Sequence, residues 1–230
     1  MQEQNVTPIE FANVVQAERT NRVLRNTYML LAASMIPTVI GAWFGVASGL
    51  SQTLLASPIV SLVVFMAGAF GFMYAIERNK DSGLGVGLLL GFTFFMGVML
   101  SRMIGMVLGM SNGATLIGMS FGGTALIFFG MASLASVIKR DLSGMGKFLF
   151  IGAMILMVAM IIMVFFPIPA LMLTLVVLML VIFSLYMMYD INRVVRGGET
   201  NYVSATMAIY MDVYNVFSAL LAILGITNRD

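Results

Sequence analysis

Seven hydrophobic runs of membrane-spanning length dominate this chain and constrain its fold more than any other feature. A helix needs about 20 apolar residues to cross the hydrocarbon core of a bilayer, and each run comes near that length. The runs lie at about 26–47, 57–77, 84–102, 114–138, 147–166, 168–192 and 204–224. Because 60% of the 230 residues are hydrophobic and only 10% are charged, a water-soluble domain could not hide the apolar surface. We therefore predict an all-α membrane protein, a bundle of seven transmembrane helices.

The chain divides into a short polar segment and a membrane domain. Residues 1–24 are polar, carry Arg19 and Arg22, and lack the organisation of a cleavable signal. We interpret them as a cytoplasmic tail, and residues 25–230 as the seven-helix transmembrane domain. Pro37 falls inside the first run, where a membrane helix tolerates it and can be kinked by it.

The basic residues predict the orientation, because positive charge gathers on the cytoplasmic side of a membrane protein. With the N-terminus inside, only Arg102 and Arg229 of the twelve basic residues fall near the outer side. The others fall on the cytoplasmic side: Arg19, Arg22, Arg25, Arg78, Lys80, Lys139, Arg140, Lys147, Arg193 and Arg196. Seven spans then place the C-terminus in the periplasm. A six-span alternative with a re-entrant last segment would return it to the cytoplasm, but that segment is long enough to cross.

Two pairs of glycines suggest where helices approach each other. Gly87 and Gly91 are four residues apart in the third run, and Gly118 and Gly122 are four apart in the fourth. Small residues at this spacing let helix backbones pack closely in lipid. We therefore predict helix contacts at these glycines.

The missing residue types exclude several classes of chemistry. The chain has no Cys and no His, which excludes disulfides, thiol nucleophiles, imidazole bases and the usual zinc and haem ligands. Every Lys lies at a helix end, which argues against a retinal Schiff base, and the net charge of +2 offers no basic face for nucleic acid. We expect no enzymatic activity and no resident cofactor. Proton exchange near neutral pH would fall to carboxylates.

Two acids inside the last two runs attract attention, since a charge in the membrane is costly unless it is paired or neutral. Asp190 lies late in the sixth run and Asp212 in the middle of the seventh. At ~1.5 Å per residue, they stand roughly 10 Å and 16 Å from the cytoplasmic boundary. Consecutive antiparallel helices can therefore bring the two carboxyls to comparable depth.

The seventh run presents a small and polar stripe that includes Asp212. Its members recur at steps of three and four residues and so share one helix face: Ala205, Ala208, Asp212, Asn215 and Ala219. Such a face is expected to meet protein and not lipid. If Asp190 and Asp212 meet there, they would share a proton, because two like charges do not both ionise easily in a poor dielectric. Deprotonation would drive the helices apart, and the carboxylates could transiently hold Ca²⁺.

Other interpretations of these charges stay open. Asp190 can pair with Arg193 at the membrane surface, one turn later, and Asp212 can make a structural hydrogen bond. Asn215 and Tyr186 are candidate supporting polar groups. We interpret a charge cluster at the end of the second run as a solvated turn, and its members are Glu77, Arg78, Lys80 and Asp81. Arg78 in this cluster is a candidate basic partner for Asp190 and Asp212.

Several stretches resemble the Bax inhibitor-1 (transmembrane Bax inhibitor motif) family. FSLYMMYDIN at 183–192 and IYMDVYNVF around Asp212 resemble its last two helices. Further matches are LRNTY at 24–28, GGTAL at 122–126, GGETNY at 197–202 and the terminal ILGITNRD. Together they resemble the bacterial branch that includes a modulator of the FtsH protease. The resemblance runs from about residue 20 to the C-terminus.

The resemblance implies a bundle with a central last helix and an aspartate pair that senses pH, at Asp190 and Asp212. It also implies a basic residue near the end of the second helix, where Arg78 is the nearest match and Glu77 an alternative occupant. Two functions follow as expectations. One is a pH-dependent Ca²⁺ leak across the bacterial inner membrane, with Ca²⁺ as the permeant ion. The other is a non-conducting modulator of the membrane-bound FtsH AAA+ protease, engaged through residues 1–24.

Overall fold

The computed structural model describes residues 8–138, 140 and 142–228, which form helices and no strands. The helices are α1 (Pro8–Ala47), α2 (Leu50–Ala56), α3 (Pro58–Asn79), α4 (Gly83–Leu108), α5 (Gly113–Val137), α6 (Ser143–Phe165), α7 (Pro169–Val195) and α8 (Tyr202–Thr227). Seven of them, all except the short α2, are long and apolar enough to cross a membrane. The predicted all-α fold with seven spans is thus confirmed. The sequence analysis did not foresee α2, which lies in the connection between the first two spans.

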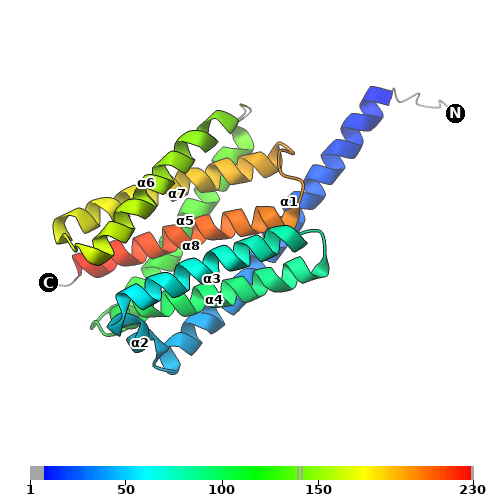
Figure 1. Ribbon diagram of the computed structural model, residues 1–230. Coiled ribbons are helices and arrows are strands. Elements are labelled where there is room, and N and C mark those ends of the chain that lie inside the picture. Colours follow the sequence, from blue (N-terminus) through cyan, green and yellow to red (C-terminus); the bar gives the residue numbers. More distant parts are fainter. Residues whose placement is uncertain (1–7, 139, 141, 229–230) are drawn as a thin grey trace.

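The first helix is longer than the hydrophobic run that predicts it. α1 begins at Pro8 and continues without interruption through Pro37 to Ala47. The part of residues 1–24 that the structure describes is therefore helical and extends the first span. Figure 1 shows this N-terminal part of α1 projecting beyond the bundle.

The last helix lies at the centre of the bundle, as predicted. α8 packs against α1, α3, α4, α5 and α7. Half of the residues in its apolar stretch are buried, a larger share than in any other span of the described chain. Its side chains can therefore meet protein on several sides, which is the setting a membrane-embedded acid needs.

Glycines allow α1 and α4 to cross with their backbones almost touching. A Cβ added at Gly41 would stand 2.2 Å from the carbonyl oxygen of Phe94, and one at Gly97 would stand 2.1 Å from that of Thr38. Both distances are far below van der Waals contact, so only glycine fits at either position.

The predicted glycine contacts are largely wrong. A Cβ at Gly87, Gly118 or Gly122 would meet nothing within 4 Å, and one at Gly91 would make an ordinary contact of 3.5 Å with Phe72. The physical reason is that spacing within one helix does not say which face of that helix meets a neighbour.

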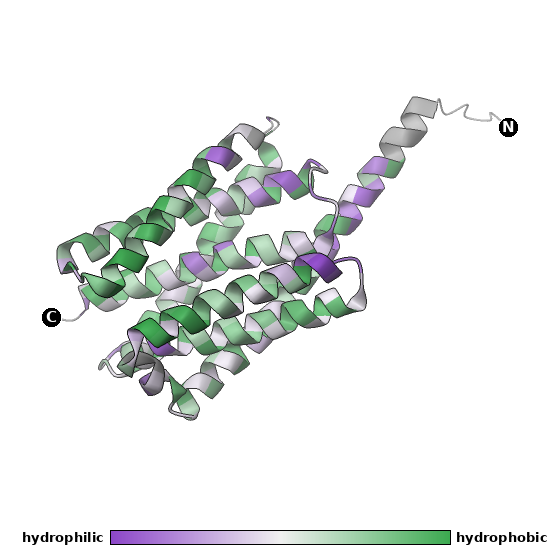
Figure 2. Ribbon diagram, in the orientation of Figure 1, coloured by the Kyte–Doolittle hydropathy of each residue, from purple (hydrophilic) through white to green (hydrophobic). Residues whose placement is uncertain are grey.

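Polar residues gather at one end of the bundle, as Figure 2 shows. This end holds the N-terminal part of α1, the turn between α3 and α4, and the loop between α7 and α8 (Figure 1). We call it the loop end. The described chain starts at this end and finishes at the other, as an odd number of spans requires.

Local sequence explains how α7 and α8 are joined there. Gly197 adopts a left-handed conformation with φ of 72°, and the amide of Gly198 donates back to the carbonyl of Arg193 at 2.8 Å. This glycine stop ends α7. Asn201 then caps α8, because its side-chain oxygen accepts hydrogen bonds from the amides of Val203 and Ser204.

Candidate functional site

Asp212 is a carboxyl buried in the middle of the central helix. It lies ten residues after Tyr202, or about 15 Å along α8 at 1.5 Å per residue. Its side chain is only 3% exposed, and its Oδ2 atom has no hydrogen-bond partner among the described residues. A bare carboxylate in such a place would be costly, so the group needs a proton or a partner.

The structure brings Asp190 to Asp212. Asp190 is half-buried on α7, which packs along α8, and the two carboxyls lie close enough for each to act on the other. Two carboxylates only accept hydrogen bonds, so a hydrogen bond between them would need a proton on one of the pair.

Three further polar groups stand near the pair. Tyr186 lies one turn before Asp190 on α7, close enough for the charges of both acids to act on its hydroxyl. Arg193 and Glu199 act on the charge of Asp190 from the loop end. Arg193 itself is held by Glu199, since its Nη2 lies 2.8 Å from Glu199 Oε2.

The candidate basic partners are therefore engaged elsewhere. Arg193 pairs with Glu199, and Arg78 donates to the hydroxyl of Tyr74 at 3.3 Å on the exposed side of α3. In the part of the chain that the structure describes, neither guanidinium is hydrogen-bonded to Asp190 or Asp212. Glu77 is the alternative occupant of the position at which the family resemblance implies a basic residue. It is Glu77, and not Arg78, that contacts α8.

The small and polar stripe of α8 is only partly a packing face. Ala205 and Ala219 are buried, at 3% and 0% exposed, but Ala208 and Asn215 are half-buried. Asn215 donates to the carbonyl of Met211 at 2.8 Å, a bond within its own helix. It therefore stands one turn from Asp212 without a bond to either acid.

A group of polar contacts joins α3 to the start of α8, and the sequence analysis missed it. Ser204 Oγ donates to Glu77 Oε2 at 2.9 Å. Asn201 Nδ2 donates to Asp81 Oδ1 at 2.8 Å and to the carbonyl of Lys80 at 3.2 Å. Glu77 also pairs with Lys80, and its carboxylate raises the pKa of the Lys80 ammonium. The GGETNY stretch could have indicated these contacts, since its Asn201 both caps α8 and hydrogen-bonds to the turn after α3.

The acid pair is too sparse to be a permanent metal site. The described residues contain no group of three or more His, Cys, Asp or Glu side chains that could hold a metal ion. Ca²⁺ sites usually supply six to eight oxygen ligands.

Fold and site together define a polytopic α-helical membrane protein with a buried acid pair on its last two helices. The chain belongs to the family described as "Inhibitor of apoptosis-promoting Bax1", which matches residues 20–229. The resemblance noted in the sequence is thereby confirmed.

Curated relatives match over almost their whole length. The chain is 37% identical to an uncharacterized protein of Neisseria meningitidis serogroup B, covering 91% of this chain and 93% of that one. It is 35% identical to an uncharacterized membrane protein of Vibrio cholerae, covering 97% and 99%. It is 31% identical to the Modulator of FtsH protease YccA of Escherichia coli, covering 92% and 93%. A second Escherichia coli sequence, similar to the same degree, is named Inner membrane protein YccA.

Proposed function

We propose that this protein is a pH-dependent Ca²⁺ leak pathway of the bacterial inner membrane, gated by Asp190 and Asp212. The observation that carries the proposal is the acid pair on the two packed helices α7 and α8, in which Asp212 is only 3% exposed and Asp190 is its neighbouring acid. The central position of α8 supports it, because a movement of α8 would be felt by the helices packed around it.

The gating step follows from the loss of the shared proton. As the pH rises, the proton leaves and two negative charges face each other across the α7–α8 contact. At an effective dielectric constant of about 20, two unit charges about 4 Å apart repel by roughly 4 kcal/mol. Since about 1.4 kcal/mol corresponds to a tenfold change in an equilibrium, this repulsion is large enough to favour separation of the helices. The exposed carboxylates would then attract a divalent cation.

The experiment measures Ca²⁺ entry into dye-loaded liposomes that contain the purified protein, from about pH 6 to 8, the range that a coupled acid pair can reach. The expected result is a flux that rises with pH in the parent and loses this dependence in Asp212→Asn. Glu18→Gln is the matched control, because it makes the same acid-to-amide change at an exposed residue near the start of α1. A folded parent that gives no more flux than empty liposomes would overturn the proposal.

A second candidate function rests on a different observation. The chain is 31% identical to a protein named as a modulator of the FtsH protease, and its α1 projects beyond the bundle, where a protein partner can reach it (Figure 1). We propose that it also regulates this protease, through residues 1–24 on the cytoplasmic side.

Co-purification tests the regulatory function separately from ion flux. FtsH should be captured with the full chain and lost when residues 1–24 are deleted, while Asp212→Asn should leave capture unchanged. Capture that does not depend on residues 1–24 would contradict the proposed contact. Because the two assays respond to different variants, one function can fail without the other.

A further inference from the structure

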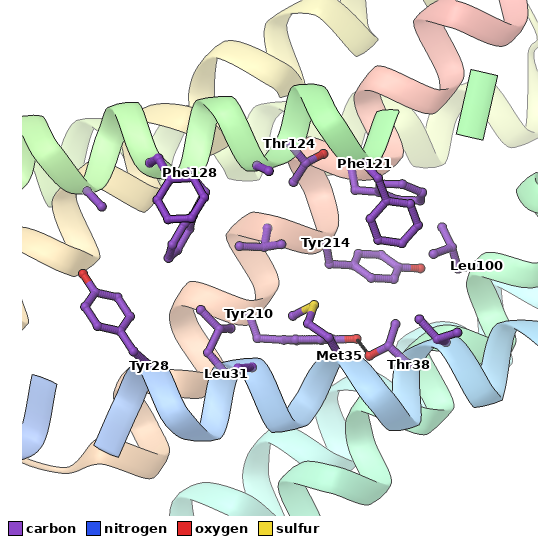
Figure 3. A pocket seen from close by; sticks show the side chains of 17 residues that line it. Tyr28, Leu31, Met35, Thr38, Leu100, Phe121, Thr124, Phe128, Tyr210 and Tyr214 are labelled. Carbon is purple, nitrogen blue, oxygen red and sulfur yellow. Dashed lines mark hydrogen bonds between the residues drawn. The ribbon is translucent and has the colours of Figure 1, made fainter. Parts of the chain in front are cut away.

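An apolar groove opens between α1 and α5, over one side of α8 (Figure 3). Its volume is about 550 Å³. α1 and α5 supply the walls and α8 the floor, where Tyr210, Tyr214 and Phe217 lie one above another at steps of three and four residues. At one end Tyr28 and Phe128 meet edge to face, with ring centroids 6.1 Å apart.

The groove offers no charged group to an ion or a polar ligand. None of its lining residues is charged. Thr38 donates to the carbonyl of Ser34 and shares a hydrogen bond of 2.9 Å with Tyr210, as Figure 3 shows. Thr124 donates to the carbonyl of Ser120 at 2.7 Å. These hydroxyls are already bonded within the protein, so the surface they leave is apolar.

The groove is continuous with the surface that faces the bilayer. Val39 on α1 and Phe121 and Phe129 on α5 line its rim and are 53%, 50% and 67% exposed. In a seven-span protein such residues lie against hydrocarbon. The floor is covered by comparison, since Phe217 is only 5% exposed. Whatever fills the groove must therefore enter sideways from the membrane.

Its dimensions select the occupant. The α1 wall, from Tyr28 to Val39, is about 16 Å long at 1.5 Å per residue. This is close to half of the roughly 30 Å hydrocarbon core, or the depth of one leaflet. Spread over that length, 550 Å³ gives a cross-section of about 34 Å². A helix from a second protein is about 10–12 Å across, wider than this cross-section, so it could place only one edge in the groove.

We propose that this groove is a binding site for one acyl chain of a bilayer lipid. The chain lies between α1 and α5 and rests on the aromatic floor of α8. Tyr210 and Tyr214 flank Asp212 in sequence but are turned about 200° from it at 100° per residue. A bound chain would thus contact the back of the helix that carries Asp212. The site does not depend on ion conduction.

Contact quenching by brominated lipid tests the site. The chain has a single tryptophan, Trp43, which is replaced by Phe so that one new reporter can be placed. The reporter is Phe217→Trp in the groove, and its matched control is Phe92→Trp, which is 0% exposed in the core. In vesicles of a phospholipid dibrominated in mid-chain, Phe217→Trp should lose most of its fluorescence and Phe92→Trp should keep it. An unquenched Phe217→Trp would overturn the proposal.

A blocking substitution separates groove from surrounding bilayer. Ala125 is an exposed residue on the α5 wall, and Ala125→Phe would fill the groove; Ala67→Phe, on the lipid-exposed side of α3, is its control. Ala125→Phe should protect the Phe217→Trp reporter, and Ala67→Phe should not. Quenching that Ala125→Phe leaves unchanged would mean that lipid reaches the reporter by another route, and would overturn the site.

A second measurement needs no substitution in the core. Native mass spectrometry of the parent in mild detergent should find one retained lipid, lost in Ala125→Phe and kept in Ala67→Phe. A protein that retains no lipid, or an Ala125→Phe variant that breaks a dimer and not a lipid adduct, would also overturn the proposal. The second outcome would assign the groove to another copy of the chain.

Discussion

At the scale of single residues, the proposed function depends most on Asp212. A carboxylate in the middle of a membrane helix costs at least a few kcal/mol unless it is neutral or paired. Here the only acid within reach among the described residues is Asp190, and one oxygen of Asp212 remains without a partner. The arrangement tolerates one negative charge far better than two, which is the physical basis of the proposed response to pH.

Replacing Asp190 by Asn tests this coupling. The amide of Asn can still donate to Asp212, so the contact between α7 and α8 should survive without a shared proton. We expect the pH dependence of Ca²⁺ flux to flatten between about pH 6 and 8, since like-charge coupling is gone. Liposome flux is the measurement, with Glu18→Gln as the control. A variant with the pH dependence of the parent would refute the coupling.

At the scale of elements, contact between helices is decided by a few backbone positions. α1 and α4 cross where Gly41 and Gly97 remove the side chains that would hold them apart. α3 is fastened to the start of α8 by Glu77, Ser204 and Asn201 at the loop end. The helices are thus held together by a close backbone crossing at the glycines and by polar side-chain contacts at the loop end.

Two alanine substitutions on α4 should have opposite consequences. Gly97→Ala should lower the free energy of unfolding by about 1–3 kcal/mol or more, because its Cβ would meet backbone that cannot yield. Gly87→Ala should be neutral or slightly stabilising, since a Cβ there meets nothing and alanine favours the helix by up to about 1 kcal/mol. Thermal unfolding in detergent measures both. Equal effects would contradict the close crossing.

At the scale of the whole molecule, the chain passes from one side of the bilayer to the other. Seven spans place its two ends on opposite sides, and the polar residues gather at the end where α1 begins (Figure 2). The positive-inside rule predicts that this end faces the cytoplasm. In that orientation, the projecting part of α1 would lie where a cytoplasmic protease domain could contact it.

Fusions to reporter proteins test the orientation. A phosphatase that is active only in the periplasm should work when it is joined to the C-terminus. A fluorescent protein that folds only in the cytoplasm should fluoresce when it is joined to the N-terminus and should not fluoresce when it is joined to the C-terminus. The reverse pattern would show that the basic residues of the loop end face outward, and would remove the cytoplasmic role proposed for residues 1–24.

The sequence by itself determined the number of spans, the absence of Cys and His chemistry, and the two acids placed inside the membrane. It could do so because lipid leaves a spanning backbone no common alternative to the helix, and because a buried charge is conspicuous in an apolar run. These properties depend on order along the chain and need no knowledge of how the helices are turned.

Only the tertiary structure decided which faces meet. Neighbouring residues on a helix point about 100° apart. The rotation of α3 about its axis therefore turns Glu77 toward α8 and Arg78 toward the exposed side of α3. The same freedom moved the close glycine contacts to Gly41 and Gly97, away from the pairs that spacing suggested. The acyl-chain groove likewise arises between α1 and α5, which are far apart in sequence. Helix rotation and packing come from all the contacts at once, and for that reason no local pattern encodes them.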